Sequence, residues 1–334
     1  MMRLSTQGAR APFLVWDNHA CPARTLPDRG LSNLARYRAA GADVVALNIG
    51  DSDFPFEGVV GLAADLKAYL NAHGEDYALV GSVSEIEQAK AQGRMAVFFD
   101  LEGLYAIGED AARIEDLFQL GVRWMSLVYN RRNALGSGVH DESDDGLTAF
   151  GRVAVREMDR LGVIKCCSHT GYRTAREALE ITARPTIFSH SNPRALHDHP
   201  RNIPDDLIVA CAKTDGVVGL NGVGIFLGDN DVRVETLARH IDYVCALVGA
   251  RHVGLGLDFV FDQDEMNREL ARASHLWPQN YGYRPGIRFF APEDLPDLAE
   301  ALAARSYSEA DIAAIFGGNW RRVAEAVWPE TSKS

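Results

Sequence analysis

The stretch MAVFFDLE, residues 95–102, decides the fold. It opens with five apolar residues that show no alternation with polar ones, a pattern typical of a parallel strand that is buried on both faces. Asp100 and Glu102 then follow at the point where such a strand would end. The stretch therefore predicts a buried parallel strand that delivers two carboxylates to the carboxyl edge of a sheet.

Seven further apolar runs repeat this pattern along the chain, and amphipathic segments such as 113–121, 151–162 and 234–249 separate them as helices would. Eight strand-and-helix units in 334 residues favour a single (β/α)8 TIM barrel over residues 1–334, with a doubly wound open sheet as the alternative. The other predicted strands are 13–17, 43–49, 124–129, 162–169, 185–190, 216–221 and 252–259.

The composition of the chain indicates which classes of partner are unfavourable and in which cellular compartment the protein is expected. The formal net charge is -12 and there is no basic block, which argues against nucleic acid and anionic membrane as partners. No apolar run reaches the length of an export signal or of a membrane span, so we expect a cytoplasmic protein. The five cysteines are an odd number and are interpreted as reduced thiols.

Polar residues with metal-binding side chains stand at the ends of five predicted strands. The carboxyl ends of barrel strands converge on one mouth, so these side chains are expected to meet there. A single histidine or acid at a strand end is more often structural, but imidazole, thiolate and carboxylate together favour zinc. The residues are Asp17, His19 and Cys21 on the first strand, Asp100 and Glu102 on the third, then His169, His190 and Asp258.

Six other histidines fall in expected helices or loops, and most of them are expected to contact solvent. They are His73, His140, His197, His199, His240 and His275.

Several long motifs resemble the membrane (renal) dipeptidase family of zinc metallopeptidases, within the metal-dependent hydrolase superfamily. The resemblance implies a barrel of the metal-dependent hydrolase type, two zinc ions and a homodimer. The motifs are DLEG (100–103), GLTAFGRVAVREMDRLGV (146–163), SHTG (168–171), FSHSNPRALHDHPRNIPDD (188–206), HVGLGLDF (252–259) and IFGGNWRRV (315–323).

The resemblance also implies a role for each matching residue. Glu102 would bridge the two metals, His19 would bind the first, and His169 and His190 the second. A hydroxide that bridges the metals would attack the amide bond of a small dipeptide, with a carboxylate as proton shuttle. That carboxylate is matched by Asp258, and Arg201 matches the arginine that pairs with the substrate's terminal carboxylate.

Two positions depart from the family pattern. Cys21 stands where the family usually has an aspartate ligand; a thiolate would still bind zinc, whereas a bystander thiol would leave one zinc ion instead of two. Tyr129 stands where a histidine commonly contacts the substrate. A phenol can donate a hydrogen bond to an oxyanion or simply line the site.

These departures keep alternatives to the dipeptidase open. The same barrel could act as an amidohydrolase on N-acyl amino acids or cyclic amides, or as a metal-dependent decarboxylase. A non-catalytic binding protein is less favoured, because a decayed site would be expected to lose buried polar residues such as Glu102 and Asp258. Residues 262–292 form a long segment after the last strand and are expected to line the pocket or to make an oligomer contact.

Overall fold

The computed structural model describes residues 11–25, 28–52 and 54–329, so both ends of the predicted 1–334 domain lie outside it. Within these residues one sheet holds ten strands, and every pair of strands is parallel. The strands are β1 (Trp16–Cys21), β2 (Val44–Asn48), β3 (Tyr77–Leu79), β4 (Met95–Leu101), β5 (Val122–Ser126), β6 (Ile164–Cys166), β7 (Thr186–Ile187), β8 (Val218–Leu220), β9 (Val253–Leu255) and β10 (Phe259–Val260).

The strands close into a barrel. Their order is β7-β6-β5-β4-β2-β1-β9-β8, and a parallel bridge between Phe188 and Val218 joins the two ends of this path. The (β/α)8 prediction is therefore confirmed, and each of the eight expected runs supplies a barrel strand. The short β3 and β10 were not expected from the sequence; they pair with the edges of β4 and β1.

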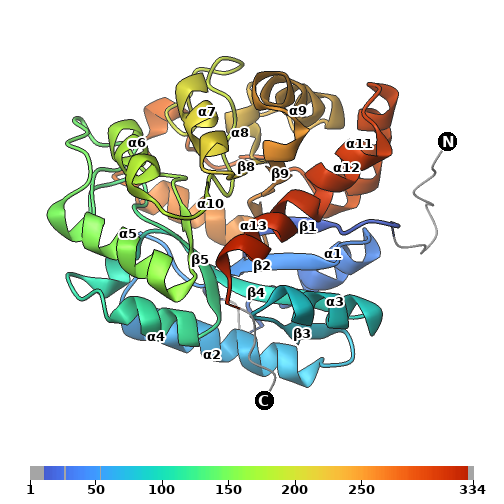
Figure 1. Cartoon of the computed structure of the whole chain (residues 1–334), viewed down its shortest axis with the longest axis horizontal. Coiled ribbons are helices and arrows are strands. Elements are labelled where there is room, and N and C mark those ends of the chain that lie inside the picture. The colour runs from blue at the N-terminus through green and yellow to red at the C-terminus, as the bar shows by residue number, and fades with distance from the viewer. Residues whose placement is uncertain (1–10, 26–27, 53, 330–334) are drawn as a thin grey trace.

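Helices surround the strands as a ring, which is the arrangement seen in Figure 1. The predicted helical segments 113–121, 151–162 and 234–249 correspond to α4, α5 and α9. The α-helices are α1 (Leu34–Ala39), α2 (Phe56–Ala72), α3 (Val83–Ala91), α4 (Arg113–Gln119), α5 (Ala149–Leu161), α6 (Tyr172–Ile181), α7 (Asp205–Lys213), α8 (Gly224–Leu227), α9 (Val234–Val248), α10 (Gln263–Arg272), α11 (Leu295–Ala304), α12 (Glu309–Ala313) and α13 (Asn319–Val327). Shorter turns of helix are η1 (Leu31–Asn33), η2 (Leu104–Ile107), η3 (Ala250–His252), η4 (Gln279–Tyr281), η5 (Pro292–Asp294) and the π-helical η6 (Ala314–Gly318).

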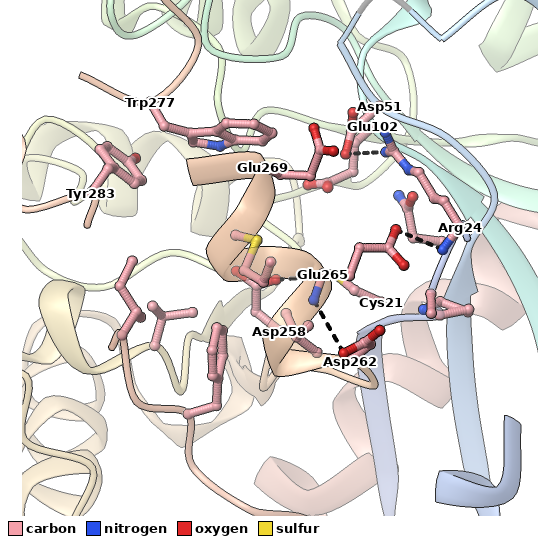
Figure 2. A pocket seen from close by; sticks show the side chains of 18 of the residues that line it. Cys21, Arg24, Asp51, Glu102, Asp258, Asp262, Glu265, Glu269, Trp277 and Tyr283 are labelled. Atoms are coloured by element: carbon pink, nitrogen blue, oxygen red, sulfur yellow. Dashed lines mark hydrogen bonds and ion pairs between the residues drawn. The ribbon is translucent and has the colours of Figure 1, made fainter. Parts of the chain in front are cut away.

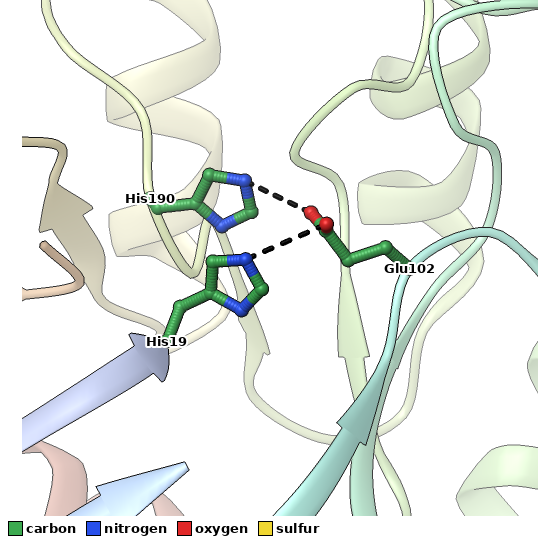
Figure 3. Close-up of side chains that lie close together, drawn as sticks. All are labelled: His19, Glu102 and His190. Carbon is green, nitrogen blue, oxygen red and sulfur yellow. Dashed lines mark ion pairs between the residues drawn. The ribbon is translucent and has the colours of Figure 1, made fainter. Parts of the chain in front are cut away.

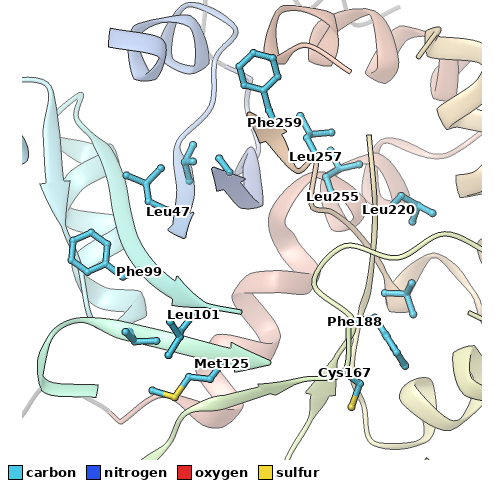
Figure 4. Close-up of a cluster of buried hydrophobic side chains, with 14 of the residues drawn as sticks. Leu47, Phe99, Leu101, Met125, Cys167, Phe188, Leu220, Leu255, Leu257 and Phe259 are labelled. Carbon is cyan, nitrogen blue, oxygen red and sulfur yellow. The ribbon is translucent and has the colours of Figure 1, made fainter. Parts of the chain in front are cut away.

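The core has two layers because successive residues of a strand point to opposite faces. On β4, Phe99 packs in the layer between strands and helices, together with Leu47 and Met125 of neighbouring strands (Figure 4). Phe98 and Trp124 belong to a second cluster on the inner face. Glu102 comes four residues after Phe98, and side chains an even number of residues apart point to the same face of a strand. The carboxylate of Glu102 is therefore directed inward.

Helix α13 covers the amino-terminal end of the barrel. Asn319 Nδ2 donates to the carbonyls of Ala250 and Val253 at 2.7 and 2.8 Å, and Trp320 Nε1 donates to the carbonyl of Leu255 at 3.0 Å. A Cβ on Gly254 would lie 2.5 Å from the Trp320 ring, so this approach depends on glycine. The opposite, carboxyl end of the barrel is left for the site. Among the described residues, no helix combines the length and the apolarity that a bilayer crossing requires.

Candidate metal centre

The carboxyl ends of the strands bring the expected ligands together. His19 and Cys21 lie within the last residues of β1, which extends beyond the predicted end at Asp17. Glu102 follows β4, and the remaining histidines lie in the connections after β6 and β7. His19, Glu102, His169 and His190 are between 0 and 6% exposed, so the centre is buried.

Glu102 lies at the middle of this centre. Its Oε1 atom is 2.9 Å from His169 Nε2 and 3.0 Å from His190 Nε2, and its Oε2 atom is 3.4 Å from His19 Nε2. Figure 3 shows the imidazoles of His19 and His190 side by side, both directed at the carboxylate. Oε1 is buried, and the two Nε2 atoms that face it cannot donate a hydrogen bond to it when the ring protons are on Nδ1. A buried carboxylate oxygen without a donor is costly, and a cation would satisfy it.

Each of the three histidines is held by its other ring nitrogen. A hydrogen bond between Nδ1 and an oxygen atom fixes the orientation of the ring and leaves Nε2 free to bind a metal ion. This is the usual arrangement of histidines that bind metals. The sequence analysis did not select Asn130 and Ser189 as partners, because neither has a side chain typical of a metal ligand. The pairs are His19 with Asp100 Oδ2 at 3.2 Å, His169 with Asn130 Oδ1 at 2.7 Å, and His190 with Ser189 Oγ at 2.7 Å.

A second group of possible ligands adjoins the first and shares His19 with it. Cys21 Sγ is 3.5 Å from His19 Nε2 and 3.4 Å from Asp258 Oδ1. Asn221 Nδ2 donates to the other carboxylate oxygen of Asp258 at 2.9 Å. Nitrogen, sulfur and oxygen donors at this spacing fit a first-row metal such as zinc.

The ionisable side chains of the centre shift one another's pKa values. Burial would lower the pKa of His19, but Glu102 and Asp100 raise it well above the usual value. Burial would raise the pKa of Glu102, yet His19 and His169 hold it well below the usual value. Burial raises the pKa of the Cys21 thiol. The carboxylate is therefore ionised, whereas the thiol needs a nearby cation to lose its proton.

Arg201 and Tyr129 both lie against His169. Arg201 is 2% exposed, and its Nη2 atom is 3.1 Å from His169 Nε2 and 3.3 Å from the carbonyl of His190. The Nε atom of Arg201 is buried and has no partner among the described residues. The Tyr129 ring stacks on His169 with centroids 4.1 Å apart, and its hydroxyl accepts a hydrogen bond from Trp277 Nε1 at 3.3 Å.

Three residues of the centre have left-handed backbone conformations, with φ of 52° at Asn130, 66° at His169 and 60° at Asp258. Residues other than glycine adopt this region infrequently, and such conformations concentrate at functional sites.

A pocket opens beside the centre, lined by Cys21, Glu102, Tyr129, His169 and Asp258. Figure 2 shows the charged side of this pocket, where Arg24 forms an ion pair with Asp51. Residues from the segment 262–292 supply much of the remaining wall. They are Asp262, Glu265, Met266, Glu269, Trp277, Tyr283, Ile287 and Phe289.

The segment 262–292 is fastened to the loop after β1. Glu265 is 8% exposed, and its carboxylate accepts hydrogen bonds from the backbone of Arg24 at 2.8 Å and of Thr25 at 3.1 Å. The Thr25 hydroxyl adds a third at 2.8 Å.

The expectation that most of the other histidines contact solvent was wrong for half of them. His140, His199 and His240 are 5, 4 and 0% exposed. The first two are covered by the segment 262–292, where the Tyr283 hydroxyl contacts His140 and the Tyr281 carbonyl contacts His199. The third lies on the inner side of α9 and bonds to the Leu227 carbonyl at 3.1 Å.

Comparison with known proteins gives a consistent family. A family model described as membrane dipeptidase (peptidase family M19) matches residues 60–275. An uncharacterised dipeptidase of Schizosaccharomyces pombe is 34% identical over 228 residues, which are 67% of this chain and 51% of that protein. Dipeptidase aclJ of Aspergillus oryzae is 34% identical over 236 residues, 69% of this chain and 51% of that protein. The chain thus spans about half the length of these relatives.

Solved structures share the fold over almost the whole chain. An amidohydrolase from Pseudomonas aeruginosa has a TM-score of 0.85 and 26% identity, covering 95% of this chain and 97% of that one. A metallopeptidase from Rhodobacter sphaeroides, solved with a phosphinate mimic of the dipeptide L-Ala-D-Ala, has a TM-score of 0.78 and 21% identity. It covers 95% of this chain and 99% of that chain, and at this identity the likeness concerns the fold.

Proposed function

Because the chain belongs to the membrane dipeptidase family, peptidase family M19, we propose that it is a metal-dependent hydrolase that cleaves small dipeptides. One observation carries the proposal: three histidines direct Nε2 at the Glu102 carboxylate while oxygen atoms hold their Nδ1 atoms. This arrangement binds metal ions in hydrolytic enzymes.

The metal of the proposal is zinc, with two ions expected. His169, His190 and Glu102 would hold one ion, and His19 with Cys21 and the same Glu102 would hold the other. Two observations support this assignment: two imidazole Nε2 atoms face the buried Oε1 of Glu102, and Cys21 Sγ lies 3.5 Å from His19 Nε2. When bound, the metal would polarise the substrate carbonyl and activate water. If Cys21 remained a protonated thiol, a single ion would be expected.

Asp258 is the proposed proton shuttle. Asn221 fixes its Oδ2 atom at 2.9 Å, while Oδ1 lies 3.4 Å from Cys21 Sγ and faces the centre. The Oδ1 atom would take a proton from the attacking water and deliver it to the leaving nitrogen, as a positioned carboxylate does in general acid–base catalysis.

Arg201 is the proposed partner of the substrate's carboxylate. Its guanidinium is buried beside His169, and its Nε donor is without a partner among the described residues. A carboxylate placed there would receive a charge-assisted hydrogen bond, which favours small substrates that end in a free acid. Tyr129 would line the reacting end of the pocket through its stack on His169.

A substrate panel tests the proposal. Protein loaded with zinc, cobalt or manganese is offered L,L and L,D dipeptides, N-acyl amino acids and cyclic amides, and amino acid release is measured. We expect dipeptides to be the preferred class and a chelator to abolish turnover. Preference for N-acyl amino acids or cyclic amides would assign an amidohydrolase instead, and release of carbon dioxide a decarboxylase. The homodimer and the cytoplasmic location stay predictions.

A further inference from the structure

Tyr283 is a buried hydroxyl group in the pocket wall that the proposed reaction leaves without a role. It is 4% exposed, belongs to the segment 262–292 and lines the pocket near Trp277, as Figure 2 shows. Its hydroxyl lies 3.0 Å from His140 Nε2, and His140 follows β5. This contact joins residues 143 positions apart in the chain.

The surroundings of His140 determine which atom carries its ring proton. Burial and the charge of Arg201 lower the pKa of His140 to about 3, so the neutral ring has one N–H at neutral pH. Its Nδ1 atom is buried and has no partner among the described residues. A proton on Nδ1 would be a buried donor without an acceptor, which folded proteins largely avoid. The proton therefore belongs on Nε2, where it is donated to the Tyr283 hydroxyl oxygen.

This assignment frees the hydroxyl proton of Tyr283. The phenol oxygen accepts from His140, so its own O–H can turn toward the pocket as a donor. The phenol also stays neutral, because burial raises its pKa above the usual value. Tyr283 is thus a neutral hydrogen-bond donor that His140 holds in place in the pocket wall.

Arg201 packs against Phe226, which lines this pocket together with Tyr283. The centroid of the Phe226 ring is 5.3 Å from the Arg201 guanidinium carbon and 6.0 Å from the Tyr283 ring centroid. His199 packs 5.7 Å from the Tyr283 ring and accepts a hydrogen bond from the Arg201 backbone at 3.0 Å. A carboxylate bound by Arg201 would therefore be near the Tyr283 hydroxyl.

We propose that Tyr283 donates a hydrogen bond to the terminal carboxylate of the substrate beside Arg201, and that His140 is the positioning residue that orients it. The proposal rests on the proposed dipeptidase function and deepens it, because it assigns part of the selectivity for free acids to the segment 262–292. Two donors from different parts of the chain would then recognise one anion.

The test compares substrates with and without the charged terminus. Kinetic constants for a dipeptide and its C-terminal amide are measured with the wild type, Tyr283→Phe and the control Tyr281→Phe. Tyr281 is a neighbouring tyrosine that stacks on His140 but does not line the pocket. We expect Tyr283→Phe to raise KM for the dipeptide about tenfold, with kcat and the amide substrate little changed. The control should keep the wild-type preference for the acid.

Several outcomes would overturn this role for Tyr283. An unchanged KM, an equal loss on the acid and the amide, or a fall in kcat alone would each do so. A wild type that cleaves no dipeptide would contradict the proposed function instead. In that case calorimetric binding of a free amino acid and its amide to the zinc-loaded wild type and Tyr283→Phe still decides whether the phenol contacts a carboxylate.

The role of His140 has its own test. His140→Gln retains a side-chain N–H that can reach the phenol oxygen, whereas His140→Leu removes it. The glutamine variant should keep most of the preference for the acid, and the leucine variant should lose it to the same extent as Tyr283→Phe. If both variants fold, as judged by circular dichroism, and lose the preference equally, the orienting hydrogen bond is refuted.

Discussion

The Nε2 atoms of His169 and His190 lie 2.9 Å apart, and each is also within 3.0 Å of the same oxygen of Glu102. The Nδ1 atom of each ring is hydrogen-bonded to a side-chain oxygen atom. When Nδ1 carries the ring proton, both Nε2 atoms therefore direct a lone pair at the same point. Lone pairs and an ionised carboxylate that face each other in a buried space favour occupation by a cation.

Removing metal is therefore expected to destabilise the protein. A ligand that binds the folded state alone raises the free energy of unfolding, by about 4 kcal/mol at a free concentration roughly a thousand times its dissociation constant. Chelator-treated protein should unfold at lower temperature than zinc-loaded protein in scanning calorimetry. Glu102→Gln should lose most of this zinc-dependent shift, and Glu115→Gln, a change on the surface of α4, should retain it. A zinc-dependent shift that survives in Glu102→Gln would place the metal elsewhere.

Replacing Cys21 tests whether the thiol is a ligand. We expect cobalt-loaded wild type to show a near-ultraviolet thiolate-to-cobalt absorption band that Cys21→Ser lacks. Cys21→Asp should keep the metal content while losing the band, because a carboxylate also binds at this position. Cys245→Ser, which changes a partly buried thiol on α9, is the matched control and should keep the band. Equal spectra for wild type and Cys21→Ser would make Cys21 a bystander.

Asp258→Asn isolates the proton transfer. The amide keeps the size of the side chain and can still bond to Asn221, but it cannot accept a proton from water. We expect kcat to fall by roughly 100- to 10,000-fold, with metal content and melting temperature close to wild type. Asp264→Asn, on the exposed side of α10, should leave kcat unchanged. Full turnover by Asp258→Asn would remove Asp258 from the mechanism.

The buried His240 predicts a dependence of stability on pH. Burial lowers its pKa from 6.5 to about 4, so below pH 6.5 the unfolded chain binds a proton that the folded chain does not. Stability from this residue is thus complete above the unfolded value and decreases as the pH falls toward 4. Between about pH 8 and about pH 5 the loss is about 2 kcal/mol.

Denaturant unfolding of wild type and His240→Gln at both pH values measures this loss. Glutamine cannot titrate, but its amide can still donate to the Leu227 carbonyl. The wild type should lose about 2 kcal/mol more than the variant on acidification. A difference between the two proteins that does not change with pH would show that His240 is protonated equally in both states.

The sequence was most informative about what the barrel topology brings together. His19, Glu102, His169 and His190 are far apart in the chain, but each follows or ends an apolar run, and parallel strands carry such residues to one mouth. The central contacts of the site were therefore predictable from strand ends and from the family motifs.

The supporting residues were not predictable in the same way. Asn130 and Ser189 act through single hydrogen bonds whose partners depend on loop geometry. The burial of His140 depends on the segment 262–292, which folds over it from 143 positions away. The pattern of residues near His140 in the sequence cannot predict a contact with a residue so far along the chain. For this reason His140 was wrongly expected to contact solvent.

The left-handed backbone at positions 130, 169 and 258 has a consequence for interpreting related sequences. Asparagine, aspartate, histidine and glycine tolerate φ near 60° better than β-branched residues do, whatever chemistry the position performs. A related barrel protein that has lost its catalytic activity would thus still be restricted to a few residue types at these three positions. If a relative keeps these residue types at the three positions, that is evidence of the same loop conformation. Only its metal content or turnover would demonstrate a catalytically active enzyme.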